Sequence, residues 1–161
     1  MSKITPFLWF DSQAEEAMNY YCSVFPDSRP GDVVRYGDAM PELSGKVMSV
    51  NFELMGQRIM GLNGGPQFKF TEAVSFFVEC QDQEEVDKYW YQLRSDGGQE
   101  GQCGWLKDKY GLSWQIIPKQ LGEMMADPDP EKSKRVVQAM LQMKKIDVAE
   151  LEQARDGQQA S

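Results

Sequence analysis

The feature that most constrains the fold of this chain is a weak internal repeat. The matched positions are Phe7 with Phe76, Glu15-Glu16 with Glu84-Glu85, Tyr20-Tyr21 with Tyr89-Trp90, and Val24 with Leu93. In each copy, a short apolar run with strand composition is followed by apolar residues at helical spacing. The sequence therefore predicts two related modules, each beginning with a strand and then a helix.

Helix boundary signals support both openings. The strands are expected at residues 4–10 and 74–80, with capping boxes at Ser12-x-x-Glu15 and Asp82-x-x-Glu85. The first helix must end before Pro26, because proline cannot continue a helix, and Gly97-Gly98 is typical of the end of the second.

Further strand candidates complete each module as a β-α-β-β-β unit. In the first half they lie at residues 32–37, 46–55 and 57–62, with a hairpin turn at Met55-Gly56-Gln57-Arg58. We expect one α+β domain over residues 1–161, with module one at about 3–65, module two at about 72–118 and a C-terminal helical extension at 119–156.

The second module ends in a tight hairpin. Residues 108–111 carry the turn chemistry, because Asp108 can bond its own backbone and Gly111 can take a positive φ. The returning strand, residues 112–117, places a polar residue, Gln115, beside Trp114. Because side chains alternate along a strand, we expect Gln115 and Trp114 to point to opposite faces.

This hairpin carries a resemblance to a known family. The run Cys-Gly-Trp-Leu-Lys-Asp-x-Tyr-Gly-x-Ser-Trp-Gln-Ile-x-Pro at residues 103–118 resembles the PhnB-like family, often labelled 3-demethylubiquinone-9 3-methyltransferase-like. Residues 4–10, 62–66 and 127–132 match as well. The family lies in the vicinal-oxygen-chelate superfamily, with glyoxalase I, extradiol dioxygenases and bleomycin-resistance proteins. The resemblance implies that the two modules form a cup-shaped, eight-stranded mixed sheet with helices outside.

The polar face of the strand around Val50 is a candidate lining of that cup. Met48, Val50, Phe52 and Leu54 alternate with Ser49, Asn51 and Glu53. The polar set either lines the concave side of the sheet or forms an ordinary solvated face. The two alternatives differ only in whether that face is concave.

The superfamily usually holds a divalent metal with His, Glu or Gln side chains, and this chain contains no histidine. The corresponding positions are Pro6, Gly61, Ala73 or Val74, and Gln115. Gln115 alone cannot hold a transition metal, which needs three or four converging ligands. Asn51 and Glu53 are the alternative oxygen donors, at a spacing that supports a site poorly. We expect no metal and no cofactor.

Methyl transfer and nucleophilic catalysis are both disfavoured. A common nucleoside-dependent methyltransferase needs a glycine-rich loop between a strand and a helix, whereas residues 63–66 precede another extended segment. Ser113 and Cys103 lack a histidine base. Cys103 is either a reactive thiol near Lys107 or Lys109 or an ordinary one. The cysteines are expected to be free thiols, with Cys22 and Cys80 in the core.

Two functional hypotheses remain. The first is a metal-independent protein that binds a flat neutral or cationic small molecule in clefts of a homodimer, with Trp105 as the best aromatic contact. The second is an enzyme of undetermined reaction that uses Glu53, Asp108 or Gln115. The expected ligand-binding residues are Asn51, Glu53, Trp105, Asp108 and Gln115.

Charge and hydropathy exclude other partners. The formal net charge of −8 repels nucleic acid and anionic membranes, no apolar run is long enough to span a bilayer, and the N-terminus leads directly into a strand. We expect a cytoplasmic protein. Four methionines of the extension either supply adaptable surface to a homodimer or close the protomer's own core: Met124, Met125, Met140 and Met143.

Overall fold

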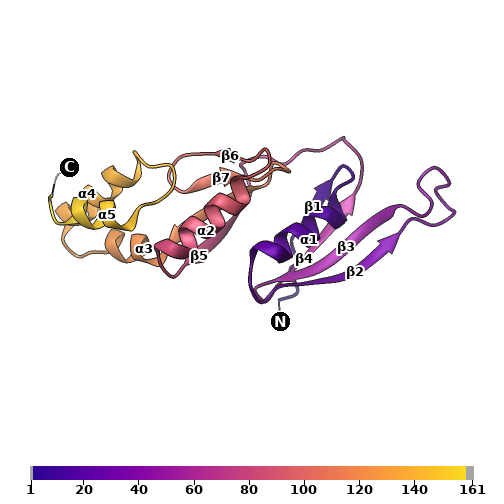
Figure 1. The fold of residues 1–161 in the computed structure, drawn as a ribbon, viewed down its shortest axis with the longest axis horizontal. Coiled ribbons are helices and arrows are strands. Elements are labelled where there is room, and N and C mark those ends of the chain that lie inside the picture. Colours follow the sequence, from indigo (N-terminus) through magenta and orange to yellow (C-terminus); the bar gives the residue numbers. More distant parts are fainter. Residues whose placement is uncertain (1, 159–161) are drawn as a thin grey trace. The chain divides into compact units, whose positions relative to one another are not determined.

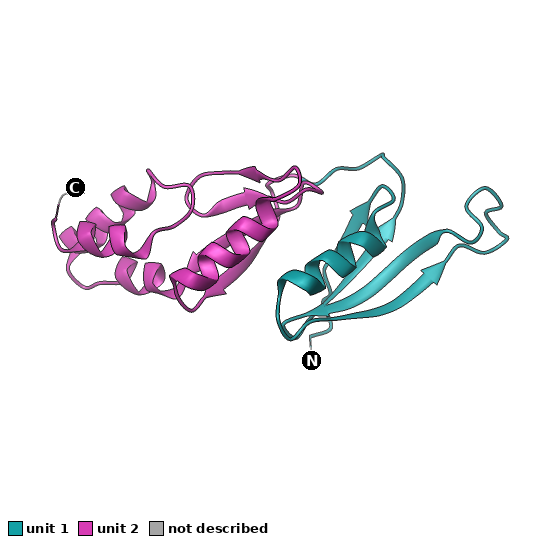
Figure 2. Ribbon diagram, in the orientation of Figure 1, with its two compact units in different colours: residues 1–70 teal, residues 71–161 magenta. Residues whose placement is uncertain are grey.

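The computed structural model describes residues 2–158. The chain forms two compact units, residues 1–70 and 71–161 (Figure 2). The boundary falls between the two expected modules, and the C-terminal extension belongs to the second unit. The joining of the two modules into one cup stays a prediction.

The first unit is a four-stranded mixed sheet with one helix (Figure 1). Its elements are β1 Phe7–Phe10, α1 Ala14–Val24, β2 Arg29–Arg35, β3 Val47–Leu54 and β4 Gln57–Asn63. The strand order is β1-β4-β3-β2, with β1 parallel to β4 and the other pairs antiparallel. A turn formed by Met55 and Gly56, both at positive φ, joins β3 to β4, as predicted.

Helix α1 packs on one face of this sheet. The alternation predicted for β3 is confirmed, since Val50, Phe52 and Leu54 are buried while the polar residues between them are half-buried. The predicted capping box of α1 is wrong. The N-cap residue, Gln13, makes no capping hydrogen bond with its side chain. Instead, the side-chain oxygen of Asn63, at the end of β4, accepts a hydrogen bond from the Ala14 amide at 2.8 Å. The cap therefore comes from tertiary structure rather than local sequence.

The second unit repeats the arrangement and adds three helices. Its first elements are β5 Ser75–Cys80, α2 Gln83–Arg94, β6 Gln99–Glu100, β7 Trp105–Lys107 and β8 Ser113–Pro118, with strand order β5-β8-β7-β6. Strands β5 and β8 are parallel, and the other pairs are antiparallel. The predicted cap of α2 is confirmed, because Asp82 accepts a hydrogen bond from the Glu85 amide at 3.0 Å. The α+β fold class with C-terminal helices is thus confirmed.

The alignment of the internal repeat is correct for the two helices, but it is displaced by one residue in the first strands of the two units. Tyr21 and Trp90 are both buried, as their alignment requires. Phe7, however, is half-exposed on the face away from α1, whereas Phe76 packs edge-on against the buried Trp114. The strand-to-helix connection is residues 11–13 in the first unit and 81–82 in the second, so it is one residue longer in the first. A one-residue shift moves a strand side chain to the opposite face.

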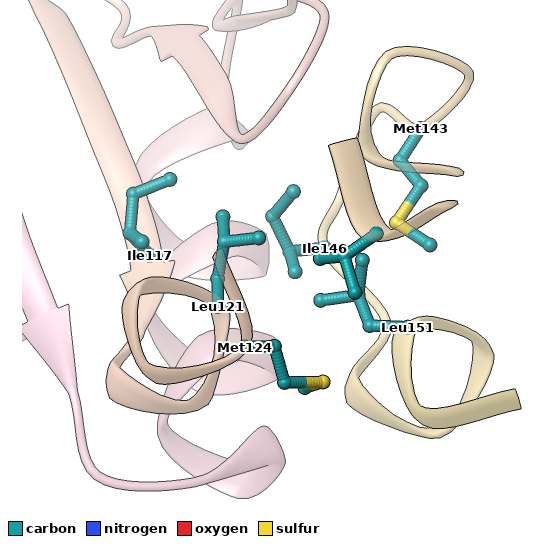
Figure 3. Close-up of a cluster of buried hydrophobic side chains, with 7 residues drawn as sticks. Ile117, Leu121, Met124, Met143, Ile146 and Leu151 are labelled. Atoms are coloured by element: carbon teal, nitrogen blue, oxygen red, sulfur yellow. The ribbon is translucent and has the colours of Figure 1, made fainter. Parts of the chain in front are cut away.

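The C-terminal extension builds a small core on the second unit. It comprises α3 Lys119–Met125, α4 Pro130–Met140 and α5 Val148–Arg155. Asp129 and Asp147 cap α4 and α5. The buried cluster in Figure 3 consists of Ile117, Leu121, Met124, Val136, Met143, Ile146 and Leu151. Of the methionines considered for a dimer surface, Met124 and Met143 are buried here and Met140 packs against the cluster, so the alternative of a protomer core is correct for them.

Polar contacts fix the extension to the rest of the unit. The Gln83 side chain donates to the Ile146 carbonyl at 2.9 Å and accepts from the Val148 amide at 2.7 Å. The Lys145 ammonium forms an ion pair with Asp87 on α2.

Within residues 2–158, no helix combines the length and apolar character needed to cross a membrane.

Candidate functional site

Gln115 lies at the centre of the sheet face that α2 leaves uncovered in the second unit. It is opposite Phe77 of β5 on one side and Trp105 of β7 on the other. Its amide nitrogen donates to the Ser75 hydroxyl at 3.0 Å. We call this surface, formed by Ser75, Phe77, Trp105 and Gln115, the open face of unit 2. It combines two aromatic side chains with an amide and a hydroxyl.

Trp114 points to the other side of the sheet, as predicted. Its side chain is 2% exposed, and its ring contacts Phe76 edge to face with centroids 5.3 Å apart. Its indole N–H donates to Asp108 Oδ2 at 2.9 Å. Adjacent residues of β8 therefore have opposite roles, with Trp114 in the core and Gln115 on the open face.

Asp108 is not positioned as a ligand contact, which corrects its place among the expected binding residues. It is 2% exposed. Besides Trp114, the backbone amides of Tyr110 and Leu112 donate to its Oδ1 at 2.8 and 3.1 Å. A buried carboxylate needs such donors. The turn and the Trp114 indole, not a ligand, use the charge of Asp108.

Trp105 has the environment expected of a binding residue. It is half-buried, and among residues 2–158 its ring and its indole N–H have no partner. It lines an open pocket of about 340 Å³ together with Glu72, Lys107 and Ser113. The last three were not among the predicted site residues, because the sequence gives no signal that residue 72 reaches β7.

Asn51 and Glu53 lie on the corresponding uncovered face of the first unit. Asn51 is opposite Met60, and Glu53 is opposite Arg58. Glu53 also forms an ion pair with Arg29 at 3.2 Å. The predicted site residues are thus divided, with Asn51 and Glu53 in unit 1 and Trp105 and Gln115 in unit 2. A cavity that they share stays a prediction.

The donor set does not fit a transition metal. Gly61 was expected on the metal-facing side, but it lies opposite Val50 and Leu8, whose buried side chains face α1. Residues 73 and 74 precede β5, and Phe77 is the residue of β5 opposite Gln115. Within the described part of the chain, no three Cys, Asp or Glu side chains converge as metal ligands would.

The cysteines are free thiols, and two of them are shielded from solvent to different degrees. Burial raises the pKa of Cys80 to about 12 and raises the pKa of the half-buried Cys22. A thiol with a raised pKa is a poor nucleophile at neutral pH, because the thiolate is the reactive form.

The first unit contains a larger open pocket that the sequence did not indicate. Its volume is about 970 Å³, and Glu15, Glu16, Tyr36 and Leu43 are among its lining residues. Tyr36 donates from its hydroxyl to the Asn63 carbonyl at 2.6 Å, which closes one side of the pocket. The pocket depends on residues 36–46, a loop with no periodic pattern from which its path could be predicted.

Comparison with known proteins places the chain in a family. Residues 2–117 match the family model described as 3-demethylubiquinone-9 3-methyltransferase. The chain belongs to this family. A solved structure of a PhnB protein from Bacillus cereus is similar, with 37% sequence identity, a TM-score of 0.66, and coverage of 73% of this chain and 99% of that one. No curated protein matches.

More distant structures share the fold of this family member. Protein PA1353 from Pseudomonas aeruginosa has 16% identity and a TM-score of 0.62, covering 73% of this chain and 98% of its own. The fosfomycin resistance protein FosX from Listeria monocytogenes has 15% identity and a TM-score of 0.55, covering 76% and 94%. The family model and the Bacillus cereus structure confirm the PhnB-like resemblance stated from the hairpin at residues 103–118.

Proposed function

We propose that this protein binds a flat, neutral or cationic small molecule without a metal, and that the open face of unit 2 contacts the ligand. The observation that carries the proposal is the unpartnered indole of Trp105 directly opposite Gln115. A half-buried aromatic ring beside a hydrogen-bonding amide is the usual composition of a small-molecule site.

An enzyme of undetermined reaction is the alternative, in which Glu53 or Gln115 acts on the substrate. Methyl transfer by the common nucleoside-dependent route has little support. Gly64-Gly65-Pro66 follows β4 and leads into a turn, and within residues 2–158 no strand is followed by a glycine-rich loop that opens a helix. The residues directly opposite Gln115 on the two neighbouring strands are Phe77 and Trp105, and neither side chain can act as a base.

Gln115→Ala tests the proposal directly. We expect ligand affinity to fall by about 1–3 kcal/mol, because a ligand polar group would be left unpaired. Trp105→Ala should weaken binding too. Ligands would be found by thermal shift with a panel of aromatic metabolites and antibiotics, and affinities measured by calorimetry. Gln142→Ala, at an exposed position, is the matched control. Unchanged affinity in both site variants would contradict the proposal.

We also propose that the protein is a homodimer. The uncovered sheet faces carry large apolar side chains, among them Phe7 and Phe77, which are 53% and 59% exposed. Exposed apolar surface of this kind is typical of an interaction site. Light scattering at micromolar concentration should give twice the mass of 18.4 kDa. A mass of one chain would show that the faces are not covered by a second copy.

A further inference from the structure

The open pocket beside Trp105 has features that indicate the charge of its ligand. We call it the β7 pocket and define it by Glu72, Glu100, Trp105, Lys107 and Ser113. Its volume of about 340 Å³ is enough for a molecule with two fused rings. It lies at the β7 side of the open face, so a ligand on Gln115 would reach it.

Ser113 provides an unpartnered polar group at this pocket. The residue is 1% exposed, and its hydroxyl has no hydrogen-bond partner within residues 2–158. Buried hydroxyls are nearly always paired, so an unpaired one needs an explanation. A ligand N–H at this position would supply the missing partner.

Trp105 provides the surface on which a flat ring can lie. No aromatic ring or cation of the described chain contacts its indole. The face of an indole carries negative charge density, and tryptophan attracts cations more strongly than the other aromatic residues do. Trp105 therefore favours a flat ring with a positive charge over a neutral ring of the same shape.

The charged side chains of the pocket favour the same ligand. Two carboxylates, Glu72 and Glu100, and one ammonium, Lys107, line the pocket, and Lys107 forms its ion pair with Glu72. Glu100 is engaged by Arg94 at 3.3 Å and by the Trp90 indole N–H at 3.0 Å.

The Lys107 ammonium pairs with Glu72, and its hydrogen bond lowers the pKa of that carboxyl, so Glu72 is ionised at neutral pH.

The ion pair between Lys107 and Glu72 can be opened at little cost in free energy. The Lys107 and Glu72 side chains are 38% and 59% exposed, and exposed ion pairs contribute little to stability. Lys107 lies directly opposite Ser113 in the β7–β8 pairing, so the two side chains are on the same face of the sheet. Movement of Lys107 away from Glu72 would free a carboxylate in the pocket that Trp105 and Ser113 also line.

We propose that the β7 pocket binds a flat aromatic cation bearing an N–H group, which replaces Lys107 at Glu72, stacks on Trp105 and donates to Ser113. This inference rests on the proposed function and specifies the ligand class of the same site. An aromatic carboxylate that replaced Glu72 at Lys107 is the opposite arrangement. The two glutamates that line the pocket and the net charge of −8 disfavour an aromatic carboxylate.

Four probes of similar shape test the charge and the hydrogen bond with the full chain. They are 4-aminoquinoline, which is protonated at neutral pH, 1-methylquinolinium, quinoline and 1-naphthoate. We expect 4-aminoquinoline to bind about tenfold or more tightly than quinoline, and 1-naphthoate to bind weakest. Calorimetry gives the affinities, and the indole N–H resonance of Trp105, assigned with Trp105→Phe, reports the position.

Two substitutions with opposite expected effects on affinity identify the side chain that pairs with the cation. Glu72→Gln should weaken 4-aminoquinoline by about fivefold, whereas Lys107→Met, which removes the competing ammonium but keeps the stem, should strengthen it. Ser113→Ala should weaken 4-aminoquinoline and leave 1-methylquinolinium, which has no N–H, unchanged. Melting curves of each variant confirm folding, and the comparison of the four probes on the unmodified protein needs no variant.

The proposal is overturned if 1-naphthoate binds tightest, if Glu72→Gln strengthens and Lys107→Met weakens the cation, or if the Trp105 resonance does not respond to millimolar 4-aminoquinoline. Its failure is distinguishable from failure of the proposed function. If Gln115→Ala and Trp105→Ala weaken a ligand from the panel while the Glu72 and Lys107 variants change nothing, only the charge assignment is wrong.

Discussion

Trp114→Ala is expected to lower the free energy of unfolding by about 3–5 kcal/mol, the range measured for removing a large aromatic side chain from a core. The side chain is buried between β8 and α2 and contacts Phe76. Its loss also removes one of the donors that satisfy the buried Asp108 carboxylate. Urea unfolding followed by circular dichroism would measure the change.

Trp105→Ala is the matched control for this experiment. The same residue type is removed from the neighbouring strand, but its indole is half-buried and has no ring contact or hydrogen bond in residues 2–158. We expect a loss of about 1 kcal/mol or less. Equal losses of stability for the two variants would contradict the deeper burial of Trp114 than of Trp105.

The sequence predicted those parts of the fold that depend on alternation and on local turn chemistry. The β3 pattern around Val50 and the opposite orientation of Trp114 and Gln115 follow from the pleat of a strand, which needs no tertiary information. The turn at Met55-Gly56 likewise follows from residue type. These predictions are confirmed because one local rule dominates at each position.

The predictions that failed depend on residues far apart in the chain. The cap of α1 comes from Asn63, which local rules cannot find when Ser12 offers a plausible capping box. Gly61 was placed on the wrong face because a strand position carried over from a family pattern is uncertain by one residue, and one residue reverses the face.

The sequence could predict the orientation of the candidate site residues on β7 and β8 but not what surrounds them. Trp105 and Gln115 were proposed because a tryptophan and a polar residue in a strand are visible in the sequence, and they lie opposite each other on one face of the sheet. Asp108 was misassigned because a turn aspartate looks the same whether its second oxygen is free or accepts from a buried indole. Glu72 and Ser113 were not predicted to line a pocket, because the contact between residue 72 and Lys107 has no signal in the sequence.

Ile146→Ala is expected to lower the free energy of unfolding by about 2–5 kcal/mol. Ile146 is fully buried in the cluster of Figure 3, where it lies among side chains from β8, α3 and α5. A methyl group added at Gly104 would lie 3.1 Å from Ile146 Cγ1 and 2.6 Å from Ile117 Cδ1, so the packing here is tight. Removing most of the isoleucine side chain would leave a cavity that these neighbours cannot readily fill.

The control is Leu141→Ala, a truncation of similar size in the same extension at a position 54% exposed, which should change stability by about 0.5 kcal/mol or less. The family match ends at residue 117, so the extension lies beyond it, yet Ile117 of β8 belongs to the same buried cluster. Because this core is shared, Ile146→Ala should shift the unfolding of the whole second unit in one transition. A separate early transition in the variant, with the Trp114 environment intact, would instead show that α3, α4 and α5 fold as an independent appendage.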